Sequence, residues 1–214
     1  MAMPGETGSL TAGVAVLVLS LAAVVGPLAG IPPWWIALAA GLALAALTAD
    51  AALFGGRGGH VLAETLPGGL GRLQRIAVHE AAHGLVAEAE SVPVRRVLVG
   101  SWASLQAGLS SGGSTEFALP PASRLPLADL RRWTRVLLAG MVAEELVYGG
   151  SIGGADDRAQ LGRLWGLSGH DVATAQREQR QARREVKRWL TERRAELDLR
   201  AEGLARVAPR LGRP

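Results

Sequence analysis

The sequence predicts a mainly α protein with a small β element, in which a two-helix transmembrane hairpin precedes a helical domain. Three observations predict this class. Two apolar runs of about 20 residues, the length that spans a bilayer core, lie near the N-terminus. Apolar residues then recur at helical spacing along most of the remaining chain. One stretch among these helices is rich in valine and favours strands. We therefore divide the chain into a hairpin at 1–54, a linker at 55–71 and a helical domain at 72–214.

The two apolar runs predict the hairpin directly. Leu10 to Ile31 contains no charged residue, and Trp34 to Phe54 is interrupted only near its end, by Thr48 and Asp50. Pro32-Pro33 leaves room for nothing but a tight turn, and the two tryptophans that follow suit a membrane interface. A removable signal peptide is the alternative for the first run. That run lacks the basic segment of such a peptide, and a second apolar run follows at once.

Charge predicts the orientation of the hairpin. Glu6 is the only charged side chain before Leu10, and the turn between the runs has none. Arginines follow the second run, at Arg57, Arg72, Arg75, Arg95 and Arg96. The positive-inside rule therefore predicts a two-pass protein of the cell (inner) membrane, with its C-terminal domain in the cytoplasm. The net charge of +4 suits an anionic lipid bilayer as a partner. Nucleic acid is not expected, because the basic residues are spread among acidic ones and no DNA- or RNA-binding motif is present.

Glycines and prolines divide the next part of the chain. The run Gly55–Gly59 predicts a flexible linker, and Pro67-Gly68-Gly69 predicts a second break. Apolar positions at helical spacing predict a helix from Arg72 to about Glu90, which Pro93 ends.

A small β element follows that helix. Val94 to Leu109 is predicted as strand, Ser110 to Thr115 as a Gly/Ser turn, and Thr115 to Leu119 as a short second strand before Pro120-Pro121. In this region Trp102, like Trp133 further on, is expected in the core or an interface rather than at a substrate.

Helices are predicted for the rest of the chain. One runs from about Leu127 to Val147, a loop covers Gly149 to Gly154, and another helix begins near Asp156. Asp171 to Arg206 is predicted as a charged helical stretch. Its intermittent apolar stripe is Val172, Ala175, Ala182, Val186, Leu190, Leu197 and Leu204. Its charges are interpreted as a solvated helix face rather than a binding site.

The motif His79-Glu80-Ala81-Ala82-His83 carries the chemistry of the chain. Two histidines four residues apart lie on one face of a helix, so their ring nitrogens can converge on one metal ion. Glu80 beside the first ligand can serve as a general base for a water molecule. The chain has no cysteine, so any metal must be held by His, Asp or Glu. Zinc fits this pattern, although two histidines and a carboxylate also suit iron. The alternative is a helix surface that holds these residues by coincidence.

A second segment carries a family resemblance. It reads LLAGMVAEELVYG at 137–149 and SIGGADD at 151–157. Together with the motif at His79, it resembles the peptidase domain of the FtsH family of membrane-anchored AAA+ zinc proteases, peptidase family M41. That family has HEAGH, a segment like LGGRAAEELxFG and then TGAxxD, and it also begins with two transmembrane helices. The resemblance covers roughly Arg72 to Val207 and implies a helical zinc-peptidase domain.

The resemblance also implies roles for particular residues. The Asp of the last family motif is a zinc ligand, which places Asp157 beside His79 and His83 in the ligand set. The loop is about one residue shorter here, so Asp156 is the alternative metal ligand. Either aspartate can instead cap a helix.

Further expectations follow from the same family. Glu144 or Glu145 could orient a ligand histidine, or both could be ordinary surface acids. Gly108 to Leu119 resembles the family's strand region beside the cleft, where an extended substrate could add as a strand, or which could simply pack as sheet. The family assembles as hexamers, so a homo-oligomer is an expected partner.

The chain departs from the family in further ways. The family's HEAGH reads HEAAH here, which leaves the ligands and the base intact. The arginine of LGGR is replaced by Met141. The segment between Phe54 and Arg72 is too short for the family's ATPase, and the only lysine, Lys187, is not in a P-loop.

The expected function is therefore a membrane-tethered, ATP-independent zinc metalloendopeptidase that acts on unfolded or flexible protein segments, with a separate ATPase as a conceivable partner. Two alternatives stay open: a non-catalytic membrane adaptor that keeps the fold, and a site-2-type intramembrane protease. Charges beside the motif, such as Arg72, Arg75 and Glu88, argue against burial in lipid.

Overall fold

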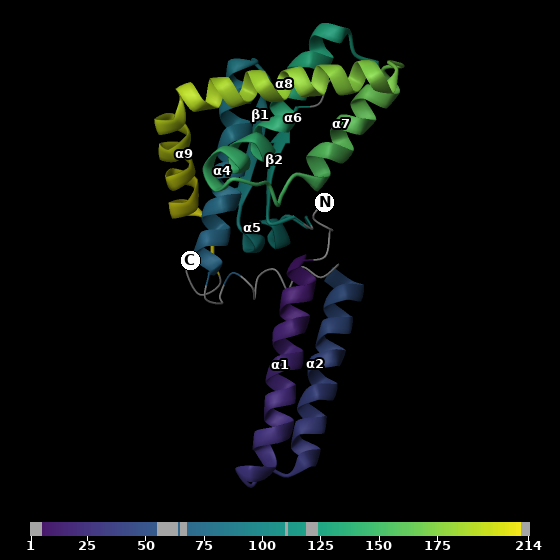
Figure 1. The fold of residues 1–214 in the computed structure, drawn as a ribbon, viewed down its shortest axis with the longest axis vertical. Coiled ribbons are helices and arrows are strands. Elements are labelled where there is room, and N and C mark those ends of the chain that lie inside the picture. Colours follow the sequence, from purple (N-terminus) through teal and green to yellow (C-terminus); the bar gives the residue numbers. More distant parts are fainter. Residues whose placement is uncertain (1–5, 55–63, 65–67, 110, 119–123, 211–214) are drawn as a thin grey trace.

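The computed structural model describes residues 6–54, 64, 68–109, 111–118 and 124–210 (Figure 1). Over these ranges the protein is mainly helical and has one two-stranded antiparallel sheet, as the sequence predicts. The predicted linker at Gly55–Gly59 and the Pro120-Pro121 break lie outside the described residues. The described helix that follows begins at Gly69, three residues earlier than the end of the predicted 55–71 linker would place it.

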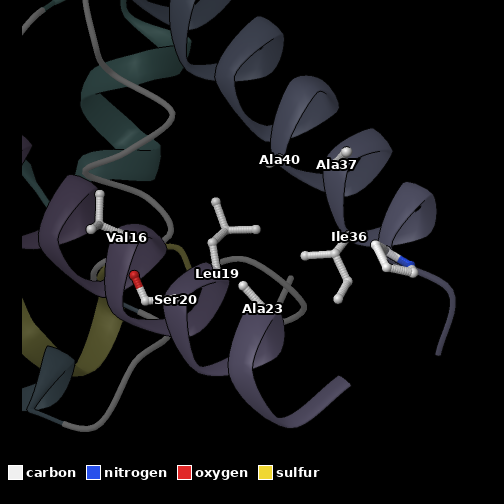
Figure 2. A pocket seen from close by; sticks show the side chains of 8 residues that line it. Val16, Leu19, Ser20, Ala23, Ile36, Ala37 and Ala40 are labelled. Atoms are coloured by element: carbon white, nitrogen blue, oxygen red, sulfur yellow. The ribbon is translucent and has the colours of Figure 1, made fainter. Parts of the chain in front are cut away.

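Helices α1 (Glu6–Leu28) and α2 (Pro33–Phe54) run side by side and pack on each other (Figure 1). They approach each other closely at Gly26, where an added Cβ would lie 2.7 Å from Ile36 Cδ1. Figure 2 shows Leu19 and Ile36 pointing toward each other across an apolar groove between the helices.

The surface of α2 is apolar and unburied. Its segment Pro33–Ala52 has a mean hydropathy of 1.7, and none of its most apolar window is buried. This helix is long and apolar enough to cross a membrane. For α1, the described apolar segment is the shorter stretch Val16–Leu28. Trp34 and Trp35, at the start of α2, are stacked and more than half exposed.

Two long helices form the centre of the remaining chain. Helix α4 (Gly69–Ala89) packs against α6 (Leu127–Tyr148). Both boundaries agree with the predicted helices to within three residues. Glycine at 68 has a φ of 93° and is followed by the first turn of α4, which explains where this helix begins. Gly149 ends α6 at a φ of 77°.

Strands β1 (Val94–Val99) and β2 (Gly113–Phe117) lie against α4. They pair antiparallel, with Val97 opposite Thr115 and Val99 opposite Gly113. The single strand predicted for Val94 to Leu109 is wrong beyond Val99. Gly100 has a φ of 97°, which ends the strand, and Ser101–Gln106 forms the short helix α5. The turn predicted to last until Thr115 is also too long, because β2 begins at Gly113.

The C-terminal part contains three helices: α7 (Ala155–Leu167), α8 (Val172–Glu192) and α9 (Arg194–Val207). Helices α7 and α8 pack on α6, and α9 packs on α4. The stretch from Asp171 to Arg206, predicted as helical, forms two helices with a break at Arg193. The break lets Leu190 and Leu197, which are both fully buried, reach the core from two different helices. Val172, predicted on the apolar stripe, is 71% exposed.

Candidate metal centre

His79 and His83 lie in the most buried stretch of α4, where every residue from Ala77 to Ala87 is buried. Their spacing of four residues puts both rings on the face that meets α6. Gly140 of α6 permits this approach, because an added Cβ there would collide with the His79 ring. The two rings lie 4.8 Å apart between centroids.

Hydrogen bonds fix the orientation of both histidines. His79 Nδ1 lies 2.7 Å from Glu144 Oε1, and His83 Nδ1 lies 2.8 Å from the carbonyl oxygen of Val136. Both partners are acceptors, so each Nδ1 must carry its proton and donate it. Each Nε2 of a neutral ring then presents a lone pair, which is the atom that binds a metal.

Asp157 supplies a third donor atom. It lies in the first turn of α7, and its Oδ2 is 3.1 Å from His79 Nε2 and 3.4 Å from His83 Nε2. The ligand atoms of these three residues all lie within 4.8 Å of one another, so the group could hold a metal ion. His83 Nε2 is buried and has no hydrogen-bond partner among the described residues. A buried ring nitrogen without a partner is costly, and a metal ion would satisfy it.

The alternative ligand does not take part in this group. Asp156 is exposed, whereas its neighbour Asp157 is partly buried and faces the histidines. Glu145 is also outside the group, because it pairs with Arg183 on α8. Of the two glutamates that were candidates to orient a ligand histidine, only Glu144 contacts one.

Glu80 is buried, and its Oε2 accepts a hydrogen bond of 2.7 Å from the Thr115 hydroxyl on β2. Burial raises the pKa of Glu80 above its usual range, and the neighbouring histidines partly offset this effect. An added Cβ at Gly113 would lie 2.9 Å from the other Glu80 oxygen, so β2 passes close to this carboxyl group.

The acidic groups and His79 shift one another's pKa in the protein without metal. Burial alone lowers the pKa of His79, but hydrogen bonds to Asp157 and Glu144 outweigh it and raise this pKa to about 10. Burial raises the pKa of Glu144, but hydrogen bonds from His79, the Ile152 amide and Arg75 lower it to about 2. The pKa of Asp157 is also held far below its usual range, against the effect of burial, by His83 and His79. A proton and a metal ion thus compete for the same nitrogen.

The contacts of Thr115, Val136 and Arg75 were not predicted from the sequence. The first two come from segments far from the motif, and nothing local indicates them. Arg75 lies four residues before His79, and residues at this spacing share one helix face. The sequence could therefore have indicated that Arg75 lies near the histidines.

The fold and the donor set together define a helical domain with a buried group of two histidines and one carboxylate. No protein-family model matches the chain, and no curated protein matches it either.

Proposed function

We propose that this chain is a membrane-tethered, ATP-independent zinc metalloendopeptidase, similar to the FtsH peptidase domain without its ATPase. The observation that supports it best is the convergence of His79, His83 and Asp157, with the buried Glu80 beside the first ligand. A hydrolase of this kind needs three protein ligands, an open coordination position and a general base. The donor set fits zinc by type and number, and the unpartnered His83 Nε2 supports a metal at this position.

Zinc bound here would make water more acidic and polarise the carbonyl group of a peptide bond. The protein's own groups would do the rest. Glu80 would accept a proton from the attacking water and later donate it to the leaving amine. A carboxyl group with a raised pKa suits both steps at neutral pH. Thr115 would keep the Glu80 carboxylate in place, and Glu144 would keep the His79 ring in place.

Strand β2 could bind a substrate as an added strand. Its residue Thr115 contacts Glu80, and the Phe117 ring packs edge-on against His83 with 6.0 Å between centroids. In the described sheet β2 pairs on one edge only, with β1. An extended peptide could add to the other edge, where backbone hydrogen bonds would bind segments of many sequences. Unfolded or flexible protein segments would be the substrates, because a folded protein has few free extended segments.

The N-terminal helices would tether this domain to a membrane. The unburied apolar surface of α2 needs a lipid environment, and α1 packs along it. The arginines after α2 favour a cytoplasmic domain, so both termini would lie on that side.

The two alternatives have less support. An intramembrane protease would have α4 in lipid, but α4 is packed against α6, α9 and the sheet. It also carries arginine and glutamate residues. An adaptor would have no need for a buried Glu80, since burying a carboxyl group is costly even when it accepts a hydrogen bond, as Glu80 does from Thr115.

Cleavage of an unfolded protein tests the proposal. The full chain in detergent, loaded with Zn²⁺, should degrade a fluorogenic unfolded protein without ATP. The same protein in its folded form should be cleaved far more slowly, and a chelator should stop the reaction. Failure of the zinc-loaded chain to cleave the unfolded protein would count against an ATP-independent peptidase.

A further inference from the structure

Glu144 accepts several hydrogen bonds beside the metal centre. It is 2% exposed and accepts four hydrogen bonds, from His79 Nδ1, Arg75 Nε and the amides of Ile152 and Gly153. Their lengths are 2.7, 2.6, 2.9 and 3.2 Å in that order. A buried carboxylate is tolerated only when charges and hydrogen bonds compensate it, and Arg75 is the cation that does so here.

Arg75 makes two further contacts besides its hydrogen bond to Glu144. Its Nη2 donates to the carbonyl oxygen of Gly150, and its guanidinium lies 4.9 Å from the centroid of the Tyr148 ring. Arg75 therefore links α4 to the segment between α6 and α7. Asp157 lies in the first turn of α7, directly after that segment.

The segment is closely packed against the centre. An added Cβ at Gly153 would lie 2.7 Å from Glu144 Oε1 and 3.2 Å from His79 Nδ1. Gly154 has a φ of 86°, and an added Cβ there would collide with Met141. The path of the chain into α7 thus depends on contacts with Glu144 and its neighbours.

We propose that Arg75 is a positioning residue for the metal centre. Its two contacts, with Glu144 and Gly150, hold His79 on α4 and Asp157 on α7 at the spacing that one metal ion requires. This inference rests on the proposed metal site and adds a residue to it. The planar guanidinium can donate to both acceptors at once, whereas a lysine ammonium group is a single point that cannot reproduce this fork.

Cobalt binding to the full chain in detergent tests the proposal, because Co²⁺ reports both affinity and coordination geometry through its visible absorption. Arg75→Met should weaken Co²⁺ binding by about 10–100-fold, as the loss of a partner behind a ligand usually does. It should also alter the absorption bands. Arg75→Lys should fall between Arg75→Met and the wild type in affinity.

Arg135→Met is the matched control. The Arg135 side chain is 27% exposed, close to the 23% of Arg75, and it also pairs with a glutamate, Glu90. The ion pairs that Arg135 makes among the described residues are with Glu90 and Glu185, and neither belongs to the metal group. This variant should keep the wild-type affinity and spectrum, although it loses a comparable ion pair.

Wild-type affinity and spectrum in Arg75→Met would overturn the proposal, and so would an equal loss in Arg135→Met. If circular dichroism shows that Arg75→Met does not fold, Arg75→Lys decides, and wild-type behaviour in that variant would overturn the proposal. Neither readout uses a substrate. A chain that binds cobalt as expected but cleaves nothing would therefore contradict the proposed function and leave the role of Arg75 standing. No cobalt binding by the wild type would contradict both.

Discussion

Helices α2 and α4 have almost the same length but opposite environments. Helix α2 has 22 residues and α4 has 21. Large apolar side chains of α2 are exposed, such as Leu42 at 63%, whereas α4 buries an unbroken stretch that includes two histidines and a glutamate. An exposed apolar helix needs an apolar solvent, and buried polar groups need specific partners. The comparison teaches that the proposed tether and the proposed metal site depend on different physics within one chain.

The largest effect should come from the polar side of this comparison. Asp157→Asn removes a charged donor atom from the group on α4 and α7, while keeping the size of the side chain. Zinc affinity should fall by more than the ~10–100-fold that is usual for partners behind a ligand. Isothermal titration or competition with a chromophoric chelator measures it.

Asp156→Asn is the matched control for that variant, because Asp156 is adjacent to Asp157 but is exposed and lies outside the metal group. Its zinc affinity should equal that of the wild type. A larger loss in Asp156→Asn than in Asp157→Asn would show that the ligand has been assigned to the wrong aspartate.

A charged substitution in α2 should have an effect of intermediate size, on the association of the protein with the membrane. Leu42 lies near the middle of this helix, where an arginine costs about 2.5–3.5 kcal/mol for insertion into a membrane. Leu42→Arg should therefore move a large fraction of the protein from the membrane pellet to the supernatant after alkaline carbonate extraction. Leu42→Ala should stay in the pellet. Equal extraction of both variants would show that α2 does not lie in lipid.

The smallest effect should be the pH dependence of stability. In chelated protein the pKa of His79 is raised from 6.5 to about 10, so its proton stabilises the fold fully below pH 6.5. That contribution is lost as the pH rises through about 10. The lowered pKa values of Glu144 and Asp157 affect stability at acidic pH. The stabilisation by these two carboxylates is present above pH ~4 and is lost as the pH falls further.

The apparent melting midpoint in chelator should therefore decrease between pH 6.5 and 9. The additional stabilisation by Zn²⁺ should increase over the same range, since the metal replaces the proton. His79→Gln is the control and should remove the decrease in chelator. A midpoint in chelator that does not change with pH would contradict the proposed coupling between His79 and the two carboxylates.

The sequence predicts the parts of this structure that local patterns determine. Helices α4 and α6 follow from apolar spacing, and the loop with its left-handed Gly149 and Gly154 follows from glycine clustering. The Gly100 turn was missed because the valines before it and the apolar residues after it look like one strand. The break at Arg193 has no glycine or proline to indicate it. Helix α8, which carries Leu190, packs on α6, whereas α9, which carries Leu197, packs on α4.

In the candidate site, too, local patterns indicate some residues and not others. The histidine pair and Glu80 follow from the spacing on one helix, and the resemblance to a family indicates Asp157. The contacts of Thr115 with Glu80 and of Val136 with His83 depend on how β2 and α6 pack against α4. Tertiary packing of this kind leaves no periodic signal in the sequence.

The most direct test of the proposed metal-peptidase mechanism measures cleavage and bound zinc on the same samples of wild type and Glu80→Gln. Glu80 is assigned the proton transfers and no metal bond, so the variant should keep its zinc. Cleavage of an unfolded protein should fall by about 10²–10⁴-fold, the usual contribution of a general base. Cleavage at the wild-type rate by zinc-loaded Glu80→Gln would contradict the central claim.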